Sequence, residues 1–183
     1  MRNLDHPKPA RPTLRVVAAE AGDLDQYIDL LEELADWLEA RGLKQWPRGR
    51  VRRSSAYFAG SIARQEVQLA FLGNELAGTL RLLMKDPIVW PEFPDDDAVY
   101  VYNLGVRRSW AGCDLGSRLL DWAARRALTL QRRFVRLDCK PDNPFLRRYY
   151  EHKGFIARGE VDAQYPDPVG LERLCRYEKA VDA

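Results

Sequence analysis

The pattern of hydrophobic and polar residues divides the chain into short segments that predict strands and helices in turn. Runs rich in β-branched and aromatic side chains predict strands, because such side chains pack well on a pleated surface. Apolar residues that recur every three or four positions predict helices with one buried face. The predicted strands cover residues 13–18, 66–72, 75–84, 98–106, 134–139, 156–160 and 173–179. The predicted helices cover residues 24–38, 51–64, 115–130 and part of 142–155.

Signals for the ends of the first helix support this division. Asp23 stands before the helix and Gln26 follows three positions later, which predicts an N-cap with a capping box. Gly42 predicts the end of the helix, because glycine adopts the left-handed conformation there at little cost.

The arrangement predicts one α/β domain over residues 13–183, since strands and helices alternate without an internal repeat or a linker. Residues 1–12 contain three prolines and few apolar side chains, and predict a mobile leader. Residues 86–97 are rich in proline and acidic side chains and predict an irregular segment. Its run Asp95–Asp97 has two open interpretations, an acidic rim that attracts a cationic amine or, as we favour, a solvated loop.

Composition narrows the classes of partner. The chain has 183 residues and a formal net charge of +2, which is too small to indicate nucleic acid or an anionic membrane as partner. It contains neither an apolar run long enough for a membrane span nor a signal-peptide core. Three widely spaced cysteines indicate a reducing cytoplasm rather than a disulfide framework. With only two histidines, we expect no metal site.

The most informative stretch joins a predicted strand, a glycine-containing loop and a helix. It reads Val106-Arg-Arg-Ser-Trp-Ala-Gly-Cys-Asp-Leu-Gly116. The start of a helix presents unpaired backbone N–H groups and the positive end of the helix dipole. Gly112 and Gly116 allow a phosphate to approach this backbone, which favours a pyrophosphate-bearing ligand. Taken alone, the pattern is also typical of a plain turn and helix start.

A second motif decides between these interpretations. It reads Asp142-Asn-Pro-Phe-Leu-Arg-Arg-Tyr-Tyr-Glu-His-Lys-Gly-Phe155 and follows the predicted strand 134–139. Together the two stretches resemble the GNAT superfamily of acyl-CoA-dependent N-acetyltransferases, whose motifs are roughly V-x-x-x-x-[RQ]-G-x-G-[ILV]-[GA] and N-x-x-[AL]-x-x-x-Y-x-x-x-G-F. The resemblance implies a single-domain GNAT-like α/β fold, with a central mixed, mostly antiparallel sheet of six to seven strands and about four flanking helices. It also implies acetyl-CoA as co-substrate.

The resemblance also implies roles for particular residues. Leu104 and Val106 fall at the strand end whose backbone pairs with the pantetheine arm and the thioester carbonyl. Asn143 falls where the second motif contacts the cofactor. Tyr150 matches the tyrosine that protonates the leaving thiolate in many relatives, and a phenol is protonated at neutral pH. The positions on the pyrophosphate loop are Ala111, Gly112, Cys113, Asp114, Leu115, Gly116 and Ser117.

Two residues of the loop depart from the family pattern. Ala111 replaces the Arg or Gln, which removes a side chain but leaves the backbone N–H. Asp114 replaces the second glycine, and its carboxylate is expected near the pyrophosphate. Asp114 can repel that group, or it can cap the following helix and compete with phosphate for the same N–H groups.

The leading hypothesis is direct acetyl transfer from acetyl-CoA to an amine of a small molecule or peptide. The alternative is a non-catalytic GNAT-fold protein that serves as a CoA-binding sensor or a scaffold. The general base stays open: Asp138 is a candidate, although an aspartate in a strand is more often structural. Trp46, Tyr57 and Phe58 line the acceptor site or belong to the core, and a homodimer is possible for this family.

Overall fold

The computed structural model describes residues 12–43, 46, 49–93, 96–166 and 169–181. The strands are β1 (Leu14–Ala18), β2 (Val67–Leu72), β3 (Glu75–Leu83), β4 (Ala98–Val106), β5 (Phe134–Cys139), β6 (Ile156–Gln164) and β7 (Leu171–Ala180). The α-helices are α1 (Leu24–Glu39), α2 (Arg50–Arg53), α3 (Ser55–Ala63), α4 (Leu115–Thr129) and α5 (Pro144–His152). Two 3₁₀ turns, η1 (Ala21–Asp23) and η2 (Arg108–Trp110), precede α1 and α4.

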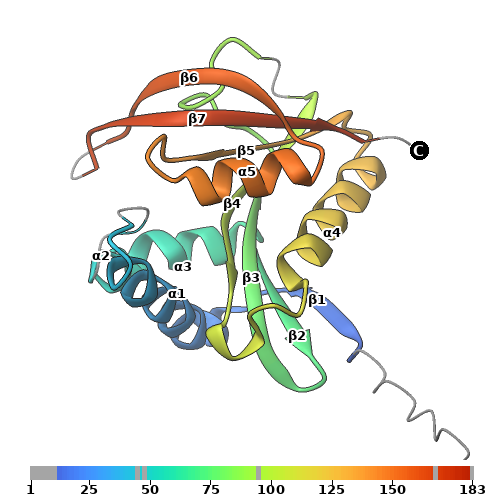
Figure 1. Cartoon of the computed structure of the whole chain (residues 1–183). Helices are drawn as coiled ribbons and strands as arrows, with labels where there is room; N and C mark the ends of the chain where they lie inside the picture. The colour runs from blue at the N-terminus through green and yellow to red at the C-terminus, as the bar shows by residue number, and fades with distance from the viewer. Residues whose placement is uncertain (1–11, 44–45, 47–48, 94–95, 167–168, 182–183) are drawn as a thin grey trace, which may run out of the picture.

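All seven strands form one sheet in the order β1-β2-β3-β4-β5-β7-β6 (Figure 1). β4 and β5 pair in parallel, and every other neighbouring pair is antiparallel. α4 connects the two parallel strands, as a parallel crossover requires. The predicted mixed, mostly antiparallel sheet is therefore confirmed.

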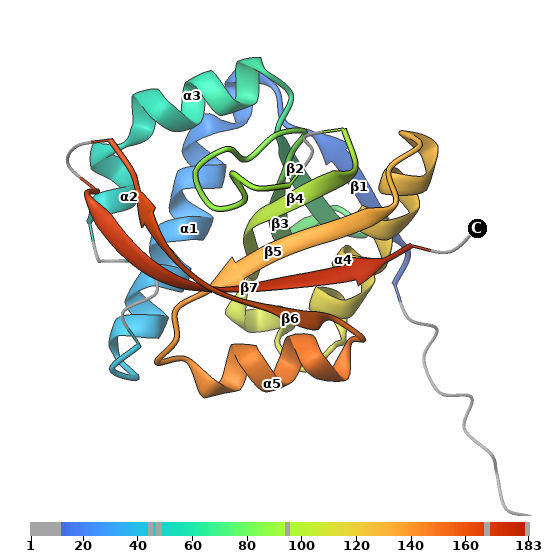
Figure 2. The same ribbon diagram turned by 90° about the horizontal axis from the view of Figure 1, so that it is seen from above.

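Helices cover both faces of the sheet (Figure 2). On one face, α4 and α5 pack on inward side chains of β3, β4, β5 and β7, where Leu119 of α4 shares a core with Val101 and Leu137. On the other face, α1 and α3 cover the β1–β3 half through residues such as Leu31 and Phe58. The rest of that face is covered by the segment between β3 and β4, which brings Val89 and Trp90 onto Tyr100. The period-two alternation of the strands supplies both cores.

The structure corrects three details of the predicted elements. The expected single helix over 51–64 is broken at Ser54 into α2 and α3, so the described part of the chain has five α-helices where about four were expected. β6 and β7 extend beyond the predicted 156–160 and 173–179. The capping box expected for Asp23 and Gln26 is wrong, because the Asp23 carboxylate accepts from the Glu20 backbone N–H at 2.7 Å and from the Gln26 side chain.

Some predictions fall outside the described residues, namely the leader over 1–12, except Pro12, and Asp95 of the acidic run. Asp97, the last residue of that run, forms an ion pair with Arg133 at 2.6 Å.

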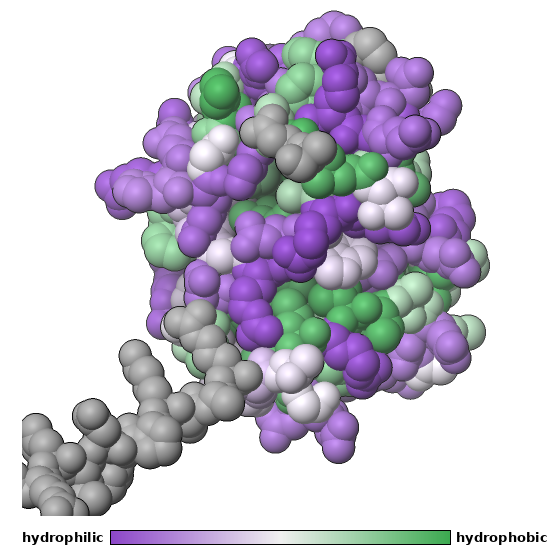
Figure 3. Space-filling model, turned by 90° about the vertical axis from the view of Figure 1, so that its right-hand side faces the viewer, coloured by the Kyte–Doolittle hydropathy of each residue, from purple (hydrophilic) through white to green (hydrophobic). Residues whose placement is uncertain are grey.

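No helix among the described residues combines the length and apolar character needed to cross a bilayer. The side of the molecule that carries α4 is mostly hydrophilic, with hydrophobic residues gathered in patches (Figure 3).

Arg136 of β5 attaches the segment between β3 and β4 to the sheet. Its side chain is 1% exposed, and its Nε donates to Glu178 Oε2 of β7 at 2.7 Å. Its Nη1 donates to the Tyr100 hydroxyl at 3.0 Å, and its guanidinium lies 4.4 Å from the Phe93 ring and 5.1 Å from the Trp90 ring. Because a buried charge needs partners on all sides, these contacts hold strand and segment together.

Replacing Glu178 by alanine removes the nearer carboxylate partner of the buried Arg136 guanidinium and leaves only Asp97, at 3.8 Å. We expect this change to lower the free energy of unfolding by about 3–5 kcal/mol, measured by chemical denaturation. Glu160→Ala is the matched control, since Glu160 pairs with Arg173 at the surface of the same hairpin and should change stability far less. Equal losses in the two variants would contradict the structural role of the buried pair.

Candidate active site

The site begins where β4 and β5 part. The last paired residues are Val101 and Leu137. Beyond them β4 continues to Val106 alongside β3 alone, while Asp138 and Cys139 of β5 pair with β7. The backbone of β4 on the β5 side therefore has no strand partner over its last five residues. Such an edge can accept an extended ligand as an additional strand.

A β-bulge bends β4 at this place. Thr79 of β3 pairs with Gly105 and Arg81 pairs with Tyr102, so one residue of β3 faces two of β4. Asn103 has a φ of +47°, a left-handed conformation that asparagine tolerates better than most residues. A bulge of this kind redirects the strand and interrupts pairing. The predicted cofactor residues Leu104 and Val106 follow the bulge directly and are half-buried.

The loop after β4 ends in the exposed N-terminus of α4. The first hydrogen bond of the helix runs from the Arg118 N–H to the Asp114 carbonyl at 3.1 Å. The N–H groups of residues 115–117 therefore have no acceptor within the helix, as is usual in a first turn. Gly112 has a φ of +80°, and residues 111–114 are exposed. These groups suit the binding of an anion.

The Asp114 side chain leaves these N–H groups available. Asp114 adopts a left-handed φ of +57°, and its carboxylate forms no hydrogen bond with the helix backbone. It accepts instead from the Ser117 hydroxyl at 2.5 Å and lies 3.6 Å from the Lys153 ammonium. Of the two expectations for Asp114, competition for the N–H groups is therefore wrong. Lys153 offsets only part of its negative charge, because the two groups are 3.6 Å apart and both are partly exposed.

Contacts with α1 hold this loop in place. Glu33 accepts from the Arg108 backbone N–H at 2.9 Å and pairs with the Arg107 side chain at 3.2 Å. The Arg108 guanidinium lies 3.9 Å from the Trp37 ring centroid. The loop is thus fixed before any ligand binds.

The helix α5 presents two neighbouring tyrosines to different surroundings. Tyr149 is half-buried, and its hydroxyl lies 3.5 Å from the Ser117 hydroxyl. It also lies so close to Gly116 that a Cβ there would be 2.8 Å from the phenol oxygen, which explains the glycine. Tyr150 is 6% exposed and packs on Phe155 and Tyr177. Burial raises the pKa of Tyr150, so its phenol stays protonated at neutral pH.

Some of the other predicted site residues are exposed in the loop, and others are buried beneath it. Asn143 is 2% exposed and caps α5, since its side chain accepts from the Leu146 N–H at 3.1 Å. The Leu115 side chain is 1% exposed in the core beneath α4, so only its backbone faces the loop. Cys113 is exposed in the loop, whereas burial raises the pKa of Cys139 to about 12, far from a reactive thiolate.

The three aromatic residues that could line the acceptor site or belong to the core lie in different surroundings. Phe58 belongs to the buried core. Tyr57 is 55% exposed, and its hydroxyl accepts from Arg81 at 3.0 Å. Trp46 lies beside the bulged end of β4, because a Cβ on Gly105 would be 3.7 Å from its ring.

A cluster of two aspartates and two tyrosines lies on the face opposite α5. We call this the aspartate–tyrosine cluster, and it consists of Asp86, Tyr102, Asp138 and Tyr165. The Tyr102 hydroxyl donates to Asp86 at 2.6 Å, and burial together with the nearby Asp138, Asp86 and Tyr165 raises the pKa of Tyr102. Asp86 and Tyr165 could not be identified from the sequence, because both belong to irregular segments whose course over the sheet has no local sequence signal.

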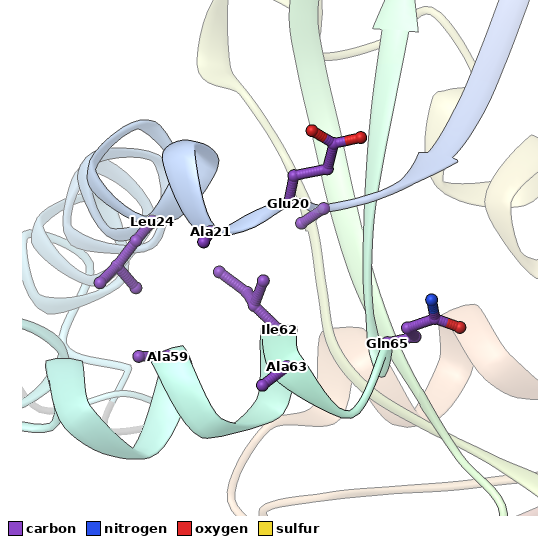
Figure 4. A pocket seen from close by; sticks show the side chains of 8 residues that line it. Glu20, Ala21, Leu24, Ala59, Ile62, Ala63 and Gln65 are labelled. Carbon is purple, nitrogen blue, oxygen red and sulfur yellow. The ribbon is translucent and has the colours of Figure 1, made fainter.

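Two hollows lie away from this place. One, of about 350 Å³, lies between η1 and the end of α3, with Leu24, Ala59 and Ile62 among its lining residues (Figure 4). The other, of about 330 Å³, includes Trp122 and Arg126 of α4. Neither is lined by a residue of the open edge of β4 or of the loop before α4.

Comparison with known proteins assigns this geometry to a family. A model described as the acetyltransferase (GNAT) family matches residues 30–155, more than half of the chain. The chain belongs to the GNAT family of acetyltransferases. The uncharacterized N-acetyltransferase YesJ of Bacillus subtilis is 30% identical over 148 residues, covering 78% of this chain and 82% of YesJ. The predicted superfamily is thereby confirmed.

Solved structures agree with this GNAT fold. An acetyltransferase of the GNAT family from Listeria monocytogenes has a TM-score of 0.75 and 24% identity, covering 91% of this chain and 94% of its own. The Salmonella typhimurium protein yncA, solved with its cofactor acetyl-CoA, has a TM-score of 0.62 and 15% identity, covering 93% and 95%. Acetyl-CoA is also the co-substrate expected from the two sequence motifs.

The charge of Asp114 should weaken binding of acetyl-CoA. Asp114→Asn keeps a residue that tolerates the left-handed conformation and can still accept from Ser117, but removes the charge. We expect acetyl-CoA to bind about three- to fivefold more tightly, since a charge at a helix N-terminus is worth roughly 1 kcal/mol. Titration calorimetry at low salt measures this change. Asp121→Asn, on the exposed side of α4, is the control, and weaker binding by Asp114→Asn would contradict the repulsion.

Proposed function

We propose that this GNAT protein transfers an acetyl group from acetyl-CoA directly to an amine of a small molecule or peptide. The observation that carries the proposal is the parting of β4 and β5 directly beside the free N–H groups of α4. In this arrangement the pyrophosphate binds at residues 111–117, and the pantetheine arm pairs with the open edge of β4 after Asn103. The thioester then lies near the last paired residues, Val101 and Leu137.

The chemistry requires only proximity and proton transfer. The amine nitrogen attacks the thioester carbonyl, the carbon–sulfur bond breaks, and the sulfur takes up a proton as the amide forms. Holding the two reactants in position supplies about 7–11 kcal/mol of the barrier in well-oriented systems. Backbone N–H groups on the open edge of β4 can stabilise the oxyanion. This scheme needs no covalent intermediate on the exposed Cys113 or the buried Cys139.

Tyr150 is the proposed proton donor to the thiolate. Its ring lies 5.8 Å from that of Tyr177, which pairs with Leu137 near the end of β5, and burial raises its pKa, as do the nearby Cys139 and Asp138. A neutral phenol in this position can protonate the sulfur as it leaves. Tyr149, one position earlier, faces the cofactor loop instead.

A non-catalytic CoA-binding protein is the second candidate, favoured by Asp114 in the pyrophosphate loop. Calorimetric titration with acetyl-CoA, followed by a thiol-release assay with a panel of amines, separates the two. Peptides belong in the panel, since a solved relative from Escherichia coli is named ribosomal-protein-S18-alanine N-acetyltransferase. Binding with transfer supports the enzyme, binding without transfer to any amine supports the sensor, and no binding at millimolar acetyl-CoA contradicts both.

Tyr150→Phe tests the proton donor. We expect kcat to fall about 100-fold, within the range usual for loss of a general acid, while the Kd for acetyl-CoA stays within about twofold. Tyr149→Phe is the contrasting variant and should change the Kd, because its hydroxyl lies at Ser117. Thermal unfolding of both variants checks the fold. Undiminished turnover in Tyr150→Phe would remove Tyr150 from the mechanism.

A further inference from the structure

The side chain of Arg81 lies beside the bulge of β4, on the face of the sheet that α3 covers. It is 3% exposed, and its Nη2 donates to Glu66 Oε2 at 2.9 Å. Its Nη1 donates both to the Tyr57 hydroxyl at 3.0 Å and to Asn103 Oδ1 at 3.4 Å. A guanidinium is always charged and has donors only. The buried Arg81 therefore fixes the orientation of the two groups that share its Nη1.

These hydrogen bonds decide where the donors of Tyr57 and Asn103 point. Because the amide oxygen of Asn103 accepts from Arg81, its NH₂ group is directed away from the guanidinium. The Tyr57 oxygen accepts from Arg81 as well, so its phenol hydrogen is left to donate elsewhere. Neither group donates to an acceptor within the described part of the chain. Asn103 is half-buried and Tyr57 is 55% exposed, so a ligand can reach this pair of adjacent donors.

The charge beside these donors is positive. Glu66 is the carboxylate that pairs with Arg81, and it also pairs with Arg64 at 2.7 Å. Because Glu66 is shared between two guanidinium groups, it compensates the charge of Arg81 only in part. Hydrogen bonds to an ionised acceptor are about twice as strong as bonds between neutral groups. The pair of donors therefore suits an anionic oxygen ligand such as a carboxylate.

The donors lie next to the place proposed for the thioester. Asn103 is the second residue beyond Val101, which is the last residue of β4 to pair with β5. Two residues of a strand span about 7 Å, a distance that a few covalent bonds can cover. A small amine that reacts at the thioester can therefore reach Asn103 and Tyr57 with a carboxylate a few bonds from its nitrogen.

We propose that Tyr57 and Asn103, oriented by Arg81, bind the carboxylate of the acceptor, so that the substrate is a small amino acid rather than a simple amine. The proposal rests on the proposed acetyl transfer and narrows its acceptor. One carboxylate oxygen accepts from the Tyr57 hydroxyl and the other from the Asn103 amide. Arg81 is a positioning residue, which acts by orienting both donors and through its charge.

Matched acceptors test the carboxylate first. Amino acids with α-, β- or γ-amino groups are each compared with their carboxamide and with the amine that lacks the carboxyl group. For the wild type we expect kcat/KM to be at least about tenfold higher for an amino acid than for its two analogues, mainly through KM. Equal values across every matched set would overturn the proposal.

Asn103→Asp replaces one donor by an acceptor of the same shape. Aspartate tolerates the left-handed conformation and can still accept from Arg81, but its second oxygen takes the place of the NH₂ group. We expect KM for the amino acid to rise by about 30-fold, because two carboxylates then face each other. KM for the amine without a carboxyl group should stay the same or fall.

The matched control is Asn74→Asp, which makes the same substitution in the exposed turn between β2 and β3 and should change neither KM. Thermal unfolding of both variants checks the fold. If Asn103→Asp raises KM equally for the amino acid and for the amine, the residue supports the structure and does not bind the carboxylate.

Tyr57→Phe removes the other donor and keeps the aromatic ring, and it replaces Asn103→Asp as the test if that variant does not fold. We expect KM for the amino acid to rise about five- to tenfold, as for loss of one hydrogen bond to a charged group, with kcat within about twofold. KM for the amine without a carboxyl group should not change. An unchanged KM for the amino acid would contradict the proposal.

Failure of this inference can be distinguished from failure of acetyl transfer itself. A wild type that acetylates amines without any preference for a carboxylate refutes only the inference. A wild type that acetylates no amine of the panel refutes the proposed function.

Discussion

Parallel neighbours in a sheet normally share hydrogen bonds along their length, but β4 and β5 share them over only four residue pairs. The bulge at Asn103 turns β4 away, and β5 continues beside β7 instead. Polar backbone groups without partners are costly away from water, so an open edge in the middle of a sheet persists only where water or a ligand can reach it. This single interruption sets the position of every group proposed to act in acetyl transfer.

The face opposite α5 is organised by buried charge. Arg136 joins β5 to β7 through Glu178 and holds the rings of Trp90 and Phe93 against the sheet. The segment that carries these rings also carries Asp86, whose carboxylate is fixed by the Val89 N–H. The ion pair therefore positions a carboxylate beside Tyr102 without contacting it. The same irregular segment thus contributes to the buried core and holds the Asp86 carboxylate in place.

Much of this architecture could be read from the sequence. The strands β2, β3, β4, β5 and β7 and the helices α1 and α4 follow from apolar periodicity, since each buries several side chains. β1 and β6 bury few side chains, and α5 was located by its motif. The break at Ser54 could not be predicted, because it depends on packing against α1 rather than on a proline or glycine. The capping of α1 was misassigned because Glu20 begins a 3₁₀ turn that has no separate hydrophobic pattern.

The parts of the candidate site that consist of backbone groups could be predicted from the sequence, whereas the side chains contributed by irregular segments could not. Leu104, Gly112 and Gly116 fall on the open strand edge and the helix start, as their motif indicated, although their contact with a cofactor stays a prediction. The surroundings of Asp138 could not be foreseen. Asp86 and Tyr165 reach it from segments distant in sequence, and long-range packing of irregular chain has no local signature.

The contacts between α1 and the loop before α4 have a consequence for engineering. Trp37 is stacked between Arg41 and Arg108, while Glu33 holds the backbone of that same loop. These contacts join α1 to the loop before α4, although Glu33 and Arg108 are 75 residues apart in the chain. A redesign of α1 that replaces Glu33 or Trp37 would therefore also loosen the loop before α4. Libraries of variants should therefore change other exposed positions of α1 and keep Glu33 and Trp37.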